Sequence, residues 1–189
     1  MPVRPVRTSD ADDLCRIYQP YVLNTAVTFI YHEPTPDTFT EKVRALTPQY
    51  PFLVYEEEGT VMGYAYASSL RPHEAYQWDV ELSVYVDEKV HGRGIGRALY
   101  SSLLRILTLQ GYRNAYAVLA MPNEKSLALH QSFGFESLGL FPNSGYKLGK
   151  WHDILWLYKP LGSFSDTPVP PVPFAEIAKE TVDSALKNA

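Results

Sequence analysis

A glycine-rich segment between a predicted strand and a predicted helix constrains the fold of this chain more than any other feature. The segment His91–Arg97 has glycine at three alternate positions. Before it, residues 79–86 alternate apolar and polar side chains as a strand does, and after it the leucines of residues 98–107 recur at helical spacing. Backbone amides at a helix N-terminus attract anions, and glycine lets an anion approach them closely. The sequence therefore predicts an anion site made of backbone amides.

Two common nucleotide-binding motifs do not fit this segment. A dinucleotide fingerprint needs a third glycine or an alanine at position 97 or 99, where this chain has Arg97 and Leu99. A Walker loop needs lysine and then serine or threonine directly after its last glycine, but Arg97 and Ala98 follow Gly96. The spacing argues against both motifs, and a plain tight turn between strand and helix is the structural alternative.

The composition excludes several classes of protein. The 189 residues include 17 Lys and Arg against 21 Asp and Glu, a net charge of −4, so sequence-independent binding of nucleic acid is not expected. A single cysteine, Cys15, cannot form a disulfide within the chain and favours a reducing, cytoplasmic location. The sequence has no run of apolar residues long enough to span a membrane, so no membrane partner is expected. Its five histidines lack the paired spacing of a metal site.

The sequence predicts a mixed α/β domain over residues 1–162, because strand-like and helix-like patterns follow one another along it. From residue 163 the chain becomes rich in proline, so residues 163–189 are predicted to be a proline-rich linker and a short helix. We expect this tail to be an appendage: a disordered linker, a helix docked on the domain or a dimer contact. Strands are expected at 3–6, 52–56, 61–70, 79–86, 114–120, 135–141 and 152–158, and helices are expected to begin near residues 8, 36, 98, 123 and 174.

The glycine segment resembles the acetyl-CoA pyrophosphate loop of the GNAT superfamily of N-acetyltransferases. The family pattern is Gln or Arg, two residues, Gly, one residue, and Gly or Ala, and here His91 stands where Gln or Arg is usual. Over residues 3–161 the chain is similar to the phosphinothricin and methionine-sulfoximine acetyltransferase branch, most specifically in the run Gly149–Asp153. The resemblance implies a GNAT-like twisted mixed sheet flanked by helices, split where the cofactor arm enters. It also implies acetyl-CoA as cosubstrate and a homodimer. Further matches lie at Gly63–Tyr66, Ala75–Trp78, Val80–Val86 and Gly145–Lys147.

N-acetylation requires a proton acceptor, because an amine near neutral pH is mostly protonated. Glu81, on the predicted strand before the glycine segment, is our candidate, and the resemblance implies the same role. The backbone N–H of Val84 is predicted to stabilise the oxyanion, and His130 to protonate the leaving thiolate. The alternatives are a solvated carboxylate for Glu81 and a structural role for His130, since a lone histidine on a helix is more often structural.

The resemblance also implies where the cofactor lies. Main-chain groups of the strand that carries Glu81 are expected to pair with the pantetheine arm as a further strand does. Asn123 bonds the pantetheine with its side chain, caps the helix that begins after it, or does both. The predicted cofactor-binding residues are Val84, Tyr85, Val86, His91, Gly92, Arg93, Gly94, Ile95, Gly96, Arg97, Asn123 and Ser126.

A small anionic amine is the predicted acceptor. Arginine pairs bidentately with a carboxylate or phosphinate, and aromatic side chains enclose an apolar chain. Lys147 belongs either to this pocket or to a partner subunit, and a plain surface or core role is the alternative for each residue. The predicted acceptor-binding residues are Phe29, Arg71, His73, Tyr76, Trp78 and Lys147.

These inferences predict an acetyl-CoA-dependent N-acetyltransferase that acts by direct transfer in a ternary complex. The expected acceptor is a small amino acid of the phosphinothricin or methionine-sulfoximine type, which would make the enzyme a detoxifier. Two alternatives stay open. One is an acetyltransferase for a protein N-terminus or another small amine, and the other is an acetyl-CoA-binding regulatory module without turnover.

Overall fold

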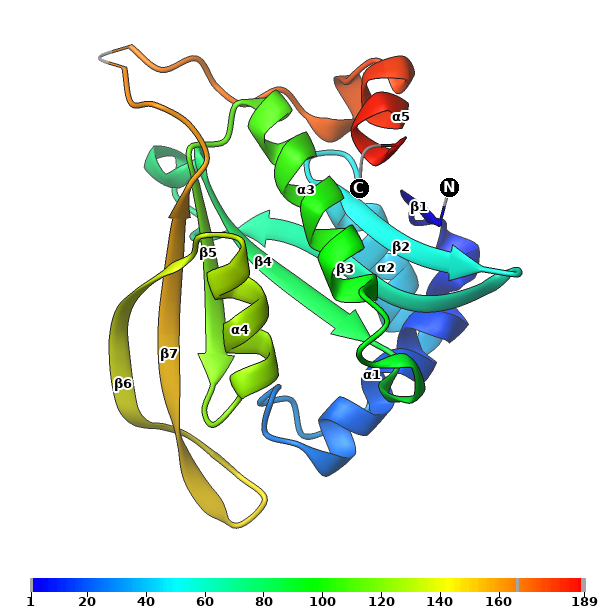
Figure 1. Cartoon of the computed structure of the whole chain (residues 1–189), viewed down its shortest axis with the longest axis vertical. Helices are drawn as coiled ribbons and strands as arrows, with labels where there is room; N and C mark the ends of the chain where they lie inside the picture. Colours follow the sequence, from blue (N-terminus) through cyan, green and yellow to red (C-terminus); the bar gives the residue numbers. More distant parts are fainter. Residues whose placement is uncertain (1, 166, 188–189) are drawn as a thin grey trace.

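The computed structural model describes residues 2–165 and 167–187, and these form a seven-stranded sheet with helices on both faces (Figure 1). Met1, Asp166 and residues 188–189, which fall within the predicted domain and tail, lie outside the described residues. The strand order is β1-β2-β3-β4-β5-β7-β6. The strands are β1 (Val3–Pro5), β2 (Phe52–Glu57), β3 (Thr60–Ser69), β4 (Asp79–Val86), β5 (Asn114–Ala120), β6 (Glu136–Lys147) and β7 (Lys150–Pro160). The helices are α1 (Ala11–Asn24), α2 (Pro36–Leu46), α3 (Ile95–Gln110), α4 (Glu124–Ser132) and α5 (Lys179–Lys187).

The arrangement confirms the predicted mixed α/β class. Neighbouring strands are antiparallel, except that β4 and β5 are parallel. A parallel pair needs a crossover connection, and α3 supplies it between β4 and β5. The glycine segment is the loop between β4 and α3, so it lies at the end of β4 as the sequence predicts.

Two apolar cores lie on the two faces of the sheet. On one face α3 packs its apolar stripe, with Leu103 fully buried, against the strands. On the other face α1 and α2 cover β2 and β3, where Phe39 of α2 is buried. Side chains of β4 alternate between the two cores: Val80 and Leu82 point to the α3 core, and Tyr85 packs in the α1 and α2 core. Strand β4 therefore links both halves of the fold.

The sheet splits between β4 and β5. Among the described residues these strands pair only over Asp79–Glu81 and Asn114–Tyr116, and beyond this point they diverge. The other edge of β4 stays paired with β3 along the whole of residues 80–86. The split expected from the family resemblance is therefore present, and it opens directly after Glu81.

The β6–β7 hairpin is longer than the sequence predicts. The sequence predicts strands at 135–141 and 152–158, but residues 142–145 continue β6 as an irregular part with a register shift before Gly145. Strand β6 lies at the edge of the sheet, where proline costs no ladder hydrogen bond on the solvent side. The actual turn lies at Leu148 and Gly149, whose φ angles are +51° and +78°.

The tail docks on the domain. Gln110, at the end of α3, donates hydrogen bonds from Nε2 to the carbonyls of Gln49 and Val172, at 2.9 and 2.8 Å. Helix α5 then lies against α3 and buries Val182, Ala185 and Leu186 in the α3 core. Of the three possibilities for the tail, the structure shows a docked helix, because its apolar side chains complete a core rather than face solvent. In the part of the chain that the structure describes, no helix is long and apolar enough to cross a membrane.

Candidate active site

The loop before α3 has the backbone conformation that only glycine adopts easily. Gly92 and Gly94 have φ angles of +82° and +81°, in the left-handed region. A Cβ built on either residue meets no atom within 4 Å, so steric crowding is not the reason for glycine there. Helix α3 begins at Ile95, and its N-cap, Gly94, has no side chain that could accept a hydrogen bond. The first turn of α3, which lies within the described residues, contains no acidic residue. The free amides and the positive end of the helix dipole therefore suit an anion.

A groove runs from this loop along β4 to α4. It contains ten of the twelve predicted cofactor-binding residues, together with Tyr21, Val27, Val90, Lys125, Ala128 and Leu129, which sequence reasoning did not place there. The two predicted residues that it lacks are Arg93, whose guanidinium binds the Glu57 carboxylate at 2.7 Å, and Tyr85. The Tyr85 ring lies instead among Tyr18, Tyr21 and Tyr64, where burial raises its pKa well above the ordinary value.

Backbone groups of β4 face this groove. Just beyond the end of β4, the Asp87 amide donates to the Met62 carbonyl at 2.9 Å. Because alternate residues of an antiparallel strand direct their backbone groups to the same side, the odd-numbered residues of β4 also form their backbone hydrogen bonds with β3. The even-numbered residues direct their backbone groups away from β3, so the N–H and C=O groups of Val84 and Val86 point toward the gap left by β5. The backbone of Val84 is thus directed as the predicted oxyanion and pantetheine contacts require.

His91 makes a contact that the family pattern did not predict. Its Nε2 lies 3.1 Å from the Val86 carbonyl oxygen and 2.9 Å from the hydroxyl of Tyr21. The Tyr21 hydroxyl itself donates to the same carbonyl at 2.6 Å. These side chains cap one of the gap-facing carbonyls of β4. Sequence reasoning missed Tyr21 because it recurs at helical spacing with core residues of α1.

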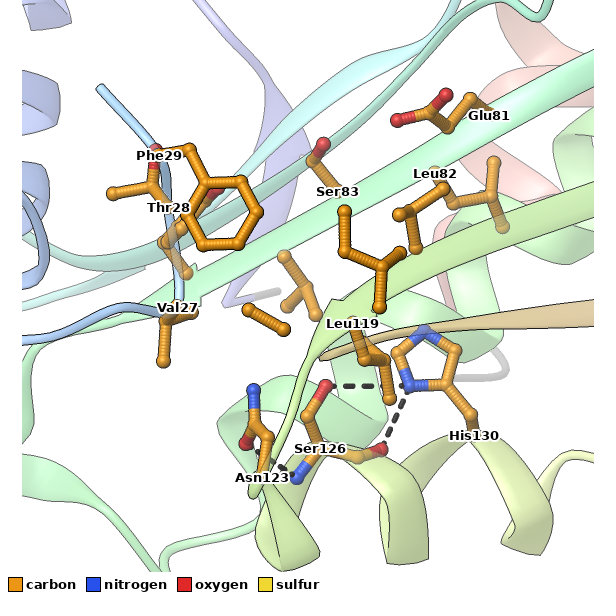
Figure 2. A pocket seen from close by; sticks show the side chains of 15 residues that line it. Val27, Thr28, Phe29, Glu81, Leu82, Ser83, Leu119, Asn123, Ser126 and His130 are labelled. Atoms are coloured by element: carbon orange, nitrogen blue, oxygen red, sulfur yellow. Dashed lines mark hydrogen bonds between the residues drawn. The ribbon is translucent and has the colours of Figure 1, made fainter. Parts of the chain in front are cut away.

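A pocket lies where the groove ends in the split of the sheet (Figure 2). Glu81 and Ser83 of β4 border it on one side, and residues of α4 and its N-terminal loop border it on another. The irregular segment 27–29, between α1 and α2, supplies a third wall. The groove and the pocket share the lining residues Val27, Val84, Asn123 and Ser126, so they are continuous.

Glu81 is half-buried in this pocket, and its burial raises the pKa of the carboxyl group above its usual value of 4.5. The positive charge of Arg71 opposes this shift without cancelling it. A carboxylate with a raised pKa is a stronger base, which suits a proton acceptor. Asp79 lies on the same face of β4, but its carboxylate accepts a hydrogen bond from Asn114 Nδ2 at 2.7 Å and does not line the pocket.

His130 lies at the base of the pocket with both ring nitrogens engaged. Nδ1 is 2.7 Å from the Ser126 carbonyl, which can only accept, so Nδ1 carries the hydrogen. Nε2 then accepts from the Tyr100 hydroxyl at 2.7 Å. Burial lowers the pKa of His130, which is only 2% exposed. A neutral ring held on both sides has no free proton for a leaving thiolate, so the geometry favours the structural alternative.

Asn123 is the N-cap of α4, because its side-chain oxygen accepts from the Ser126 amide at 3.3 Å. Its side chain also lines both the groove and the pocket. The capping alternative is confirmed, and the residue is still placed for a contact with a ligand. Among residues 2–165 and 167–187, no three His, Cys, Asp or Glu side chains are grouped to hold a metal ion.

The predicted acceptor-binding residues are not all in one place. Phe29 lines the pocket, whereas His73 and Tyr76 are exposed on the loop between β3 and β4. The guanidinium of Arg71, on the same loop, lies 5.7 Å from the centre of the Trp156 ring on β7. Arg71 therefore bridges the split in the sheet on the side of Glu81.

Two predicted acceptor-binding residues, Trp78 and Lys147, do not line the pocket and have polar groups bound elsewhere in the chain. Trp78 donates from its indole nitrogen to the Val169 carbonyl of the tail, at 2.9 Å. Lys147 is buried, and its Nζ donates to the Thr28 carbonyl at 2.7 Å. The polar groups of both side chains thus bind the backbone of this chain. Neither partner could be predicted from the sequence, because both partners lie in segments of irregular conformation.

A mixed sheet that splits beside a glycine-rich helix N-terminus is the arrangement expected of an acetyltransferase fold. The chain matches the model of the acetyltransferase (GNAT) domain over residues 3–156. It belongs to the GNAT acetyltransferase family, and like the named relatives below it is an N-acetyltransferase.

Similar proteins agree on this family. The phosphinothricin N-acetyltransferase of Streptomyces viridochromogenes is 33% identical over 177 residues, which cover 94% of each chain. The L-methionine sulfoximine/L-methionine sulfone acetyltransferase of Salmonella typhimurium is 34% identical over 161 residues, 83% of this chain and 92% of that one. A crystal structure of a phosphinothricin acetyltransferase from Sinorhizobium meliloti in complex with AcCoA has a TM-score of 0.85 and 36% identity, and it covers 89% of this chain and 94% of that one.

Proposed function

We propose that this enzyme transfers the acetyl group of acetyl-CoA to the amine of a small amino acid of the phosphinothricin or methionine-sulfoximine type. The continuity of the groove and the pocket carries the proposal, because a molecule held at the glycine loop reaches the carboxylate of Glu81. The names of the relatives from Streptomyces viridochromogenes and Salmonella typhimurium support the acceptor class.

The described residues fit acetyl-CoA. Its diphosphate suits the free amides of the loop that contains Gly92 and Gly94, and Arg97 and Lys125 add positive charge to the groove. The gap-facing backbone of Val84 suits the amide-bearing arm, as a further strand would. When bound there, the molecule supplies an activated thioester to the pocket.

The residues of the pocket support direct transfer in a ternary complex. Glu81 accepts one proton from the ammonium group, directly or through water. The neutral nitrogen then forms a bond to the acetyl carbon, and the carbon–sulfur bond breaks to release the thiolate of CoA, which takes up the second proton from the nitrogen. The Val84 amide is directed to stabilise the oxyanion. Cys15 lies in α1, outside the groove and the pocket, and burial raises the pKa of its thiol, which opposes a role as nucleophile.

A screen of acceptors tests this proposal. Thiol release is measured with acetyl-CoA and each of methionine sulfoximine, phosphinothricin, the common amino acids and short peptides with a free N-terminus. The proposal expects turnover with the first two amines to exceed turnover with the peptides. Binding of CoA without acetylation of any amine would identify a regulatory module instead.

A second candidate acceptor is a protein N-terminus. It is favoured by the likeness to the crystal structure of a ribosomal-protein-alanine N-acetyltransferase from Brucella melitensis, with 32% identity and a TM-score of 0.80. That match covers 85% of this chain and 98% of the other chain. Turnover with an alanine-initiated peptide that exceeds turnover with methionine sulfoximine would establish this alternative.

We also propose a homodimer in the cytoplasm. The β6–β7 hairpin exposes several large apolar side chains, which a second copy of the chain would cover. Size-exclusion chromatography with light scattering tests the dimer, and a monomer at micromolar concentration would refute it. The cytoplasmic location stays a prediction from the single cysteine. The exposed side chains are Leu138, Leu140, Phe141, Tyr146, Leu148 and Trp151.

A further inference from the structure

One wall of the pocket has an irregular conformation. Val27, Thr28 and Phe29 line the pocket, but none of them belongs to a helix or a strand. In Figure 2 they lie on the side of the pocket away from His130. A segment without regular backbone hydrogen bonds keeps one conformation only if other parts of the fold hold it. The contacts that hold this wall therefore control the shape of the pocket.

Lys147 makes the first of these contacts. Its side chain is buried, at 3% exposure, although lysine is almost never fully buried. Nζ donates to the Thr28 carbonyl at 2.7 Å, and among the described residues no carboxylate forms an ion pair with it. The Thr28 hydroxyl is in turn 2.6 Å from the Tyr18 hydroxyl of α1. Thr28 is thus fixed between the β6–β7 hairpin and α1.

Gly145 makes the second contact. A Cβ on this residue would lie 2.1 Å from Cε2 of Phe29, so the Phe29 ring occupies the space that a side chain would need. The His152 ring lies 6.2 Å from the Phe29 ring, and its Nε2 is 3.0 Å from the Lys147 carbonyl. The same hairpin therefore holds the backbone of Thr28 and the ring of Phe29.

We propose that Lys147 is a positioning residue for the acceptor: through the Thr28 carbonyl it fixes the Phe29 wall and so sets the size of the amine that reaches Glu81. This inference rests on the proposed function, because it requires the acceptor to enter this pocket. The ammonium group does not bind the acceptor, since it is buried and directed to the backbone. Neither Lys147 nor Phe29 lines the groove. Val27 of the same segment does, but Lys147 and Gly145 contact Thr28 and Phe29 rather than Val27, so binding of acetyl-CoA is expected to be unaffected.

Lys147→Met tests the proposal, because methionine fills the space of the side chain but donates no hydrogen bond. Lys150→Met is the matched control, since Lys150 is the exposed cross-strand neighbour of Lys147. We expect Lys147→Met to raise the KM for methionine sulfoximine about five- to tenfold and to reduce discrimination against a bulkier or smaller amino acid. The Kd of acetyl-CoA is expected to stay unchanged, and Lys147→Arg to restore part of the discrimination.

A second pair of variants moves the wall without changing Lys147. Gly145→Ala places a methyl group where the Phe29 ring lies, whereas Gly139→Ala on the same strand meets no atom within 4 Å. We expect Gly145→Ala to reproduce the loss of discrimination and Gly139→Ala to behave as wild type. This pair decides the question if Lys147→Met does not fold.

The outcomes separate the inference from the proposed function. An active enzyme in which Lys147→Met and Lys150→Met have the same KM and the same acceptor preference overturns the inference alone. A shift in the Kd of acetyl-CoA equal to the shift in the KM also overturns it, because the damage would then be general. A wild-type enzyme that acetylates no amine would refute the proposed function first.

Discussion

Gly94→Ala provides a direct test of the amide cradle. At φ +81° a residue with a Cβ is strained, by roughly 1–2 kcal/mol. The loop can relieve this strain only by turning its peptide planes, which redirects the amides before α3. The methyl group itself would project into open space beside the loop, where an anion would approach. We expect both effects to weaken the binding of acetyl-CoA about tenfold or more, which corresponds to about 1.4 kcal/mol.

Gly59→Ala separates this effect from loss of stability. Gly59 has nearly the same backbone conformation, φ +79°, and the same open surroundings, but it lies in the β2–β3 turn. Both variants are expected to have similarly lowered melting temperatures. Only Gly94→Ala is expected to have a raised Kd for acetyl-CoA in isothermal titration calorimetry. Equal dissociation constants for the two variants and the wild type would refute the cradle.

Three further predictions concern Glu81, His130 and the tail. Glu81→Gln is expected to lower kcat by about 100-fold or more with an unchanged Kd of acetyl-CoA. Because burial raises the pKa of Glu81, ionisation of this group destabilises the fold above pH 4.5. Glu81→Gln is therefore also expected to raise the melting temperature at neutral pH. The kcat/KM of the wild type is expected to fall as the pH drops through the raised pKa, because the protonated carboxyl group cannot accept a proton. A pH-independent kcat/KM or an unchanged kcat would remove Glu81 from the mechanism. His130→Gln is expected to lower the melting temperature and to leave kcat nearly unchanged. A large loss of kcat at an unchanged melting temperature would instead support His130 as the general acid. Leu186→Ala is expected to reduce the free energy of unfolding by about 2–5 kcal/mol in denaturant titration, whereas Leu23→Ala, at 46% exposure, serves as a control with little effect.

The sequence predicts the elements that local chemistry specifies. Strict alternation over residues 79–86 identifies β4, and the glycines after it identify a turn that needs positive φ at Gly92 and Gly94. The helix end at Gly111 is also specified locally, because its φ of +93° suits a C-terminal glycine. The groove beside α3 follows from these same residues. Most predicted cofactor contacts therefore lie together in the structure.

Contacts between distant segments could not be predicted in this way. Lys147 and Trp78 have polar groups that an acceptor pocket would use, and their sequence neighbours suggested that use. Their partners, the carbonyls of Thr28 and Val169, are backbone groups that look alike at every position of a sequence. His130 was ambiguous for the same reason, since only the fold brings Tyr100 within 2.7 Å of its ring. Burial and pairing of side chains depend on the tertiary structure.

The divergence of β4 from β5 gives the sheet an edge in its interior. An edge at the border of a sheet can recruit a strand from another molecule and start aggregation, and proteins protect such borders with charges or irregular strands. This inner edge is protected by its position, because the two strands remain joined at one end and leave a slot closed on that side. A slender ligand can enter such a slot from its open end more readily than a folded chain can, so the enzyme keeps unpaired backbone groups available without the usual risk of self-association.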